Sequence, residues 1–193
     1  MADLILASSS PRRKDFVSKL GLDFKIVVPD IDESVRPHEH ACDYVKRIPL
    51  EKASLIAQDH VLEVVLAADT IVVCDDTILG KPVDREDAKR ILRMLSGRTH
   101  EVMTAACIVY NHEVKQLFES TQVTFAPLSE ELIDTYVASG ECDDKSGAYA
   151  LQGIGAMLIE RVSGSVSSVV GLPICQVRCV LEDFGLKVKA VIV

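Results

Sequence analysis

One stretch of eleven residues constrains this chain more than any other. Residues 64–74 read Val-Val-Leu-Ala-Ala-Asp-Thr-Ile-Val-Val-Cys, in which nine apolar residues surround one acid and one hydroxyl group. A run that is this apolar and this rich in β-branched residues predicts a strand that is buried on both faces of a sheet. Burying an unpaired carboxylate is costly, so Asp69 must meet a cation, a metal or hydrogen-bond donors, or else become protonated.

This constraint leaves two interpretations of Asp69. In the first, the acid is a general base, since sites that force a carboxylate into apolar surroundings are where perturbed pKa values and proton acceptors occur. In the second, it is a structural carboxylate that accepts hydrogen bonds from backbone N–H groups. The pattern favours the first interpretation and does not exclude the second.

Helix-like and strand-like segments alternate along the chain, which predicts an α/β protein. Helices are expected between capping and terminating residues, and Pro49 is expected to kink or split the second of them. The expected strands are 4–7, 24–28, 64–74, 100–110, 114–125 and 187–193, with a hairpin at Asn111-His112. The expected helices run from Ser10 to Gly21, Ala41 to Gln58, Asp84 to Gly97, Ser129 to Gly140 and Pro173 to Phe184.

Composition limits the classes of protein that this chain can belong to. Its 193 residues, 48% of them hydrophobic, suit one domain covering residues 1–193, and no break in composition demands a second. A net charge of −8 argues against a nucleic-acid partner, which a basic surface would favour. No apolar run reaches the roughly 18–20 residues of a membrane span. Six scattered cysteines without a CxxC pair, and an N-terminus unlike a signal peptide, favour free thiols and a cytoplasmic location.

The segment after the first expected strand is suited to an anion. Ser8-Ser9-Ser10-Pro11-Arg12-Arg13 places hydroxyl groups and two guanidinium groups at the N-terminus of a helix. The free N–H groups and the positive dipole end favour an anion there, and arginine offers paired donors that match phosphate oxygens. The alternative is a capped helix with two solvated arginines.

A lysine interrupts the apolar face of the helix expected at 41–58. Val45, Ile48, Lys52, Leu55 and Ile56 share that face by helical periodicity. Lys52 therefore either extends its ammonium group out to solvent along the helix or points inward to hold an anion. The sequence does not decide between these two arrangements.

Three further positions are weaker candidates. Lys81 lies in the turn Gly80-Lys81-Pro82, for which a solvated turn is the default. The loop 30–33 supplies three carboxylates, Glu33 among them, and either is simply solvated or serves Mg²⁺, which proteins hold through one or two carboxylates plus substrate phosphates. Gln152 stands among small residues, where its amide either reads the edge of a base or bonds to backbone. No P-loop, dinucleotide-binding turn, HExxH or GxSxG motif is present.

Taken together, these segments resemble the Maf family of nucleoside triphosphate pyrophosphatases. The matching pieces occur in the family's order and span nearly the whole chain. They are residues 8–13, Arg36-Pro37, Glu51-Lys52-Ala53, Ala68-Asp69-Thr70-Ile71-Val72, Gly80-Lys81-Pro82, residues 96–102, Asp144-Lys145-Ser146-Gly147-Ala148-Tyr149 and Gly171-Leu172-Pro173.

The resemblance implies an enzyme that cleaves the α–β phosphoanhydride of a nucleotide to give a monophosphate and pyrophosphate. It implies an elongated mixed sheet with flanking helices and two lobes around a cleft, as in inosine triphosphate pyrophosphatases. Asp69 falls on the family's proton acceptor, and Arg12, Thr70 and Gln152 fall on its specificity positions. Asp69-Thr70 together with Gln152 is similar to the branch that acts on dTTP and UTP, and modified pyrimidine nucleotides are further candidate substrates.

The roles expected on this basis form one hypothesis. Arg12, Arg13, Lys52 and Lys81 would clamp the triphosphate, Ser8 would donate to a phosphate oxygen, and Thr70 and Gln152 would read a pyrimidine. A divalent cation, Mg²⁺ or Mn²⁺, would be held by the phosphates and by Glu33 or Asp69.

A second function remains open at this point. The chain could instead be a nucleotide-binding regulator of cell division that binds tightly and turns over little. In either case the apolar segment 188–193 is a candidate dimer contact.

Overall fold

A computed structural model describes residues 3–189 and divides the chain into two compact units. The first unit comprises residues 1–69, 104–119 and 171–193, and the second comprises 70–103 and 120–170. Three long strands contribute residues to both units, and each unit has hydrophobic clusters of its own. Whether residues 1–193 form a single domain of two lobes stays a prediction.

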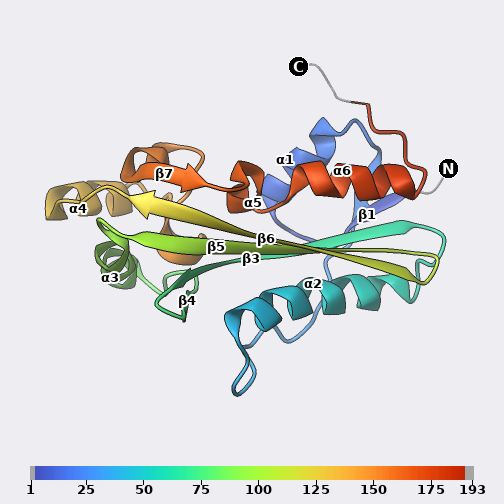
Figure 1. Ribbon diagram of the computed structural model, residues 1–193, viewed down its shortest axis with the longest axis horizontal. Helices are drawn as coiled ribbons and strands as arrows, with labels where there is room; N and C mark the ends of the chain where they lie inside the picture. Colours follow the sequence, from blue (N-terminus) through green and yellow to red (C-terminus); the bar gives the residue numbers. More distant parts are fainter. Residues whose placement is uncertain (1–2, 190–193) are drawn as a thin grey trace. The chain divides into compact units, whose positions relative to one another are not determined.

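The described residues contain six α-helices and seven β-strands, which Figure 1 shows as coiled ribbons and arrows. The helices are α1 (Pro11–Lys19), α2 (Ala41–Ala57), α3 (Arg85–Leu95), α4 (Glu130–Ala138), α5 (Val166–Val170) and α6 (Ile174–Asp183). The strands are β1 (Leu4–Leu6), β2 (Phe24–Ile26), β3 (Val64–Cys74), β4 (Thr77–Leu79), β5 (Thr99–Tyr110), β6 (Glu113–Phe125) and β7 (Ile159–Ser163). Two short 3₁₀ segments, Ser146–Ala148 and Ile154–Leu158, precede β7.

The strands form one mixed sheet in the order β2-β1-β3-β5-β6-β7, with β4 paired to β3. Strand β1 runs parallel to both β2 and β3, with Leu4 opposite Phe24 and Val64, whereas β4 and β7 are antiparallel to their neighbours. The prediction of an α/β fold with a mixed sheet and flanking helices is confirmed.

In the first unit, helices cover both faces of the sheet (Figure 1). Helix α2 packs through Ala53 on Ile5, Val65 and Cys107, whereas α1 and α6 pack on the residues that alternate with these. Every residue from Val64 to Ala68 is at most 1% exposed. The segment 64–68 is apolar throughout because both faces of β3 are covered there.

Local signals in the sequence account for the ends of several elements. Ser10, Asp84 and Ser129 cap α1, α3 and α4 by accepting hydrogen bonds from backbone N–H groups of the first turn. Asn111 and His112 both have positive φ, which a two-residue turn between β5 and β6 requires. The predicted caps and the predicted hairpin are confirmed.

The structure differs from the sequence predictions in two places and adds short elements. Pro49 was expected to kink or split α2; the helix continues through Pro49, so it does not split there, and the kink stays a prediction. Pro49 is itself buried. Residues 187–189 form no strand, although the Lys189 N–H donates to the Leu20 carbonyl, and Val188 packs on the core. Residues 190–193, to which that prediction and the candidate dimer contact extend, lie outside the described residues. Strands β4 and β7 and helix α5 were not predicted.

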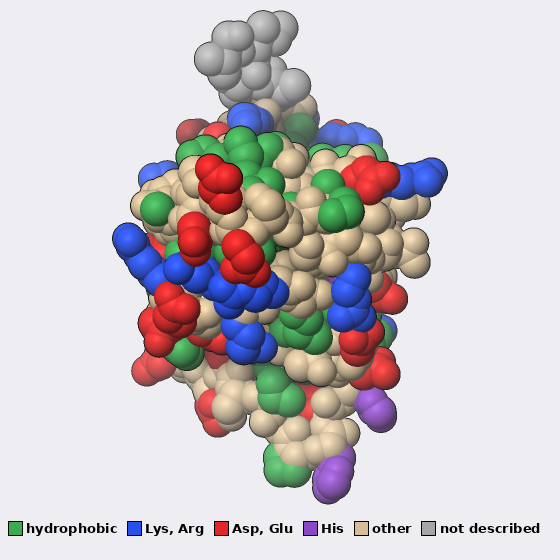
Figure 2. Space-filling view, turned by 90° about the vertical axis from the view of Figure 1, so that its left-hand side faces the viewer, with side chains coloured by type: hydrophobic (Ala, Val, Ile, Leu, Met, Phe, Trp, Pro, Cys, Tyr) green, Lys and Arg blue, Asp and Glu red, His purple; other side chains and the backbone are tan. Residues whose placement is uncertain are grey.

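The charges on the surface and the lengths of the helices are relevant to two classes of partner, nucleic acids and membranes. On the face drawn in Figure 2, Lys and Arg side chains are interspersed with Asp and Glu side chains. Between residues 3 and 189, none of the helices combines the length and the apolar character needed to cross a bilayer.

A buried histidine lies in the core of the second unit. His100 is 3% exposed, its Nε2 lies 2.8 Å from the Tyr149 hydroxyl, and its ring meets Phe125 edge-on at 5.1 Å between centroids. Its Nδ1 is buried and has no hydrogen-bond partner within residues 3–189. Burial lowers the pKa of His100 from 6.5 to about 4, because an imidazolium in this apolar cluster would lose its hydration.

The low pKa of His100 predicts a pH-dependent stability. Between pH 6.5 and about 4 the unfolded chain binds a proton that the folded chain does not, so the free energy of unfolding should fall by up to about 3 kcal/mol as pH drops through this window. Urea unfolding at a series of pH values measures this slope. A His100→Asn variant should be less stable at pH 7 but should lose this part of the slope, and an unchanged slope would contradict the assignment.

Candidate active site

The side chain of Lys52 is buried between two carboxylates. Its Nζ lies 2.8 Å from Glu33 Oε2 and 4.0 Å from Asp69 Oδ1, and only 10% of the side chain is exposed. Glu33 comes from the loop before α2, Lys52 from α2 and Asp69 from β3. Lys52 therefore points inward and pairs with acids, which excludes the arrangement in which it extends to solvent.

A second cation lies at the start of α1. Arg13 donates through Nε to the Gly171 carbonyl at 2.9 Å and through Nη1 to Ser8 Oγ at 3.3 Å. Burial lowers its pKa, while the negative charge of Asp69 acts in the opposite direction. Asp69 therefore has one cationic side chain, Lys52, at 4.0 Å and interacts electrostatically with Arg13.

Ser8 and Arg12 supply donors at the same helix end. Ser8 Oγ acts as acceptor toward the Ser10 N–H and toward Arg13, which leaves its proton to be donated. Arg12 Nε is buried and has no hydrogen-bond acceptor among the described residues. Because a buried donor without an acceptor is costly, a ligand with acceptor oxygens suits this position.

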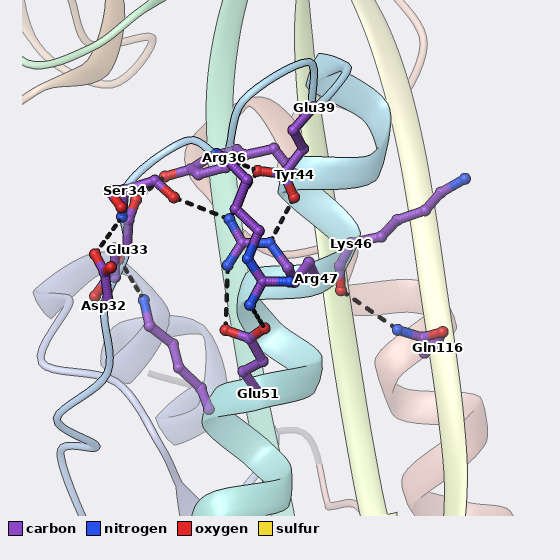
Figure 3. Close-up of polar contacts among 11 residues, drawn as sticks. Asp32, Glu33, Ser34, Arg36, Glu39, Tyr44, Lys46, Arg47, Glu51 and Gln116 are labelled. Atoms are coloured by element: carbon purple, nitrogen blue, oxygen red, sulfur yellow. Dashed lines mark hydrogen bonds and ion pairs between the residues drawn. The ribbon is translucent and has the colours of Figure 1, made fainter.

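The loop that carries Glu33 is held on α2 by an ion-pair network (Figure 3). Arg47 contacts both oxygens of Glu39, at 2.5 Å and 2.8 Å, and its Nη2 donates to the Ser34 carbonyl at 2.9 Å. The Tyr44 hydroxyl donates to the carbonyl of Glu33 itself at 2.9 Å. These contacts hold the backbone at Glu33 and at the next residue, Ser34.

The network extends along α2 to the residue before Lys52. Glu51 accepts from Arg47 Nη1 at 3.1 Å and from Arg36 Nη2 at 2.8 Å. Hydrogen bonds from Arg47 lower the pKa of Glu39 to about 2, so this pair is ionised throughout the neutral range. Sequence reasoning missed Arg47, Glu39 and Tyr44; the only signal was the i,i+4 spacing of Arg47 and Glu51.

The remaining predicted site residues belong to the second unit. Thr70 directly follows Asp69 on β3 and is half-buried. Lys81 is exposed in the turn after β4, where the carbonyl of the preceding Gly80 accepts from the Gly147 N–H at 3.0 Å. Gln152 is exposed in the loop before Ile154–Leu158.

The chain on its own does not offer a complete metal site. Within residues 3–189, no group of three or more His, Cys, Asp or Glu side chains is arranged to hold an ion. Glu33 and Asp69 nevertheless bring two carboxylates to the same ammonium group. This donor set fits a hard cation such as Mg²⁺ that takes its other ligands from substrate phosphates and water.

The arrangement in the first unit therefore combines anion-binding donors with a carboxylate that can accept a proton. Arg12, Arg13 and Ser8 offer donors at a helix N-terminus, and Asp69 lies on the adjacent strand with Lys52 beside it. Donors that are already in place where negative charge develops, with a nearby base, suit hydrolysis of a phosphoanhydride.

Known proteins and one family model resemble this chain over nearly its whole length. The model of the family described as "Maf-like protein" matches residues 3–184. A protein of Hahella chejuensis named "dTTP/UTP pyrophosphatase" is 49% identical over 188 residues, covering 96% of this chain and 94% of its own. Proteins of the same name from Vibrio parahaemolyticus and Bacillus mycoides are 47% and 45% identical and cover 94% and 95% of this chain and 96% of their own lengths.

Two solved structures share the fold at low sequence identity. A HAM1 protein from Coxiella burnetii aligns with a TM-score of 0.53 and 16% identity, over 95% of this chain and all of its own. The Ham1 protein of Staphylococcus aureus aligns with a TM-score of 0.52 and 13% identity, over 94% of this chain and 99% of its own. At these identities the likeness concerns the fold alone.

The Arg47 network predicts how the Glu33 loop responds to substitution. Arg47→Lys keeps the charge but not the paired donors, so Glu39 and the Ser34 carbonyl cannot both be satisfied. We expect a loss of about 1–3 kcal/mol in the free energy of unfolding, and faster amide hydrogen exchange in residues 30–39. Arg36→Lys is the matched control, because Arg36 is 61% exposed in its pair with Glu51 and should change little. Wild-type exchange in Arg47→Lys would show that the network does not hold the loop.

Proposed function

The chain belongs to the Maf-like protein family, and we propose that it hydrolyses dTTP and UTP to the nucleoside monophosphate and pyrophosphate. Modified pyrimidine triphosphates are included in this proposal. The observation that carries it is the buried Lys52, held between Glu33 and Asp69 and next to the donors of α1. Relatives with the printed name "dTTP/UTP pyrophosphatase", matched over nearly their whole length, support the choice of substrate.

In the proposed reaction, water adds across the α–β anhydride and Asp69 accepts its proton. Arg12 and Arg13 bind phosphate oxygens through guanidinium donors, and Ser8 donates its hydroxyl proton to another. The ammonium group of Lys52, 4.0 Å from Asp69 Oδ1, orients that carboxylate toward the attacking water. Lys81, in the second unit, is the fourth proposed phosphate contact.

We also propose a divalent cation, Mg²⁺ or Mn²⁺, as the cofactor. Glu33 and Asp69 would hold it together with the phosphates, in keeping with the two carboxylates that converge on Lys52. When bound, it would neutralise phosphate charge and make water more acidic.

Thr70 and Gln152 are the proposed contacts to the base. A side-chain amide offers one donor and one acceptor, which match the carbonyl and imide N–H of thymine or uracil. A cytoplasmic location and a homodimer complete the proposal. The free state of all six cysteines supports a reducing compartment.

Product analysis tests the proposal against its rivals. Purified protein is incubated with a panel of nucleotides and Mg²⁺, and the phosphate products are identified. Pyrophosphate from dTTP and UTP supports the proposal, and orthophosphate indicates a phosphatase. Tight binding without product would favour the alternative, a nucleotide-binding regulator of cell division.

Asp69→Asn removes the proposed proton acceptor with little change in shape. We expect kcat for pyrophosphate release to fall at least about 100-fold, while the Kd for dTTP, measured by calorimetry, stays within a few-fold of wild type. A variant that turns over at the wild-type rate would remove Asp69 from the chemistry.

Gln152→Glu replaces the donor–acceptor amide with an acceptor-only carboxylate. The relative kcat/KM across dTTP, UTP and dCTP should change, because the imide carbonyl loses its donor. If relative kcat/KM values match those of wild type, Gln152 does not take part in base recognition.

A further inference from the structure

The carboxylate of Glu141 binds the backbone of a loop rather than a cation. Its two oxygens accept from the Ile154 N–H at 2.9 Å and from the Gly155 N–H at 2.7 Å. Glu141 follows the end of α4, and the two amides open the 3₁₀ segment Ile154–Leu158. Burial is the largest single influence on the pKa of Glu141 and raises it. The hydrogen bonds from Gly155 and Ile154 act in the opposite direction, and the net effect is a lowered pKa.

The hydroxyl of Tyr136 extends this contact to the other side of the loop. It donates to Glu141 Oε2 at 3.0 Å and accepts from the Ala150 N–H at 3.2 Å. Tyr136 is 1% exposed within the hydrophobic core of the second unit. Burial and the bond to Glu141 raise its pKa, so the hydroxyl keeps the proton that it donates.

Two glycines let the loop approach these side chains closely. A Cβ on Gly153, whose φ is +103°, would collide with Glu141 Oε1. A Cβ on Gly155 would collide with the Ala150 carbonyl and would lie 2.8 Å from the Tyr136 hydroxyl oxygen. Glycine at both positions therefore serves close backbone approach.

Between the residues held in this way lies Gln152, whose side chain is exposed. We propose that Glu141 and Tyr136 are positioning residues that fix the Ala150–Gly155 loop, so that Gln152 discriminates among nucleotide bases. This rests on the proposed function, in which Gln152 contacts the base. Neither positioning residue touches the substrate in this proposal; they act through the backbone on both sides of Gln152.

The physical argument is that recognition through one amide depends on where its backbone is held. A hydrogen bond tolerates only a few tenths of an ångström and a limited range of angles, and a mobile loop loses it for part of the time. Three anchored N–H groups within six residues remove most of the freedom of this loop. Loosening them should weaken discrimination between bases while sparing the phosphate contacts of the first unit.

The test uses two substitutions and one control. Glu141→Gln leaves one carbonyl oxygen for two amides, and Tyr136→Phe removes only the hydroxyl, so a folding defect in one variant does not end the test. The control is Glu131→Gln, which changes an exposed acid on α4, the helix that carries Tyr136. For each, we measure amide hydrogen exchange in residues 150–155, kcat/KM for dTTP and dCTP, and the Kd of each nucleotide.

We expect faster exchange in residues 150–155 and a fall of about tenfold in the dTTP-to-dCTP ratio of kcat/KM, mostly through KM for dTTP. Adding Glu141→Gln to Gln152→Ala should cause no further loss of discrimination, since both act on one contact. A purely structural role predicts equal losses for both nucleotides and additive effects, and either result would overturn the proposal. If the wild-type protein releases no pyrophosphate, the proposed function fails, but the Kd ratios and exchange rates still decide the role of Glu141.

Discussion

The ammonium group of Lys52 is the charge around which several polar contacts of the first unit are arranged. A lysine with 10% of its side chain exposed needs counter-charges, and Asp69 and Glu33 supply them from a strand and from a loop. The loop contact in turn needs a fixed backbone, which Arg47 and Tyr44 supply from the same helix that carries Lys52. Lys52 and Asp69 are only 10% and 15% exposed, so removing either leaves a poorly hydrated charge without its partner, whereas Glu33 is half exposed and its contact is screened by solvent. Stability and the proposed chemistry therefore depend on the same contacts.

Sequence patterns predicted the parts of this fold that obey local rules. The apolar run 64–74 predicted a strand covered on both faces, and caps such as Ser10 and Asp84 marked the starts of helices. The cost of burying a carboxylate predicted that Asp69 would meet a cation, a metal or donors, or become protonated, and the structure places the Lys52 ammonium group 4.0 Å from it. Which way Lys52 points could not be predicted, because the same helical face allows both arrangements until Glu33 is known to be near.

The residues that were missed depend on contacts distant in the sequence or on very short elements. Arg47 binds a carbonyl 13 positions away, and Glu141 binds amides 13 and 14 positions away. A charged residue in a polar segment is usually solvated, and nothing local to these residues indicated otherwise. Strands β4 and β7 have 3 and 5 residues, too few to show a period, and pairing with a long neighbour stabilises them. Pro49 is the opposite case: proline disfavours the interior of a helix, but Pro49 is buried inside α2, which continues through it.

One of the four boundaries between the two units falls at the peptide bond between Asp69 and Thr70. On the proposed assignment, proton transfer and most of the phosphate contacts belong to the first unit, while Thr70, Gln152 and its anchors belong to the second. Mutations that remodel base preference can then accumulate around α4 and the Ala150–Gly155 loop without repacking the core that holds the acid. A lineage that kept its hydrolytic half could in this way acquire new substrates by altering the other half alone.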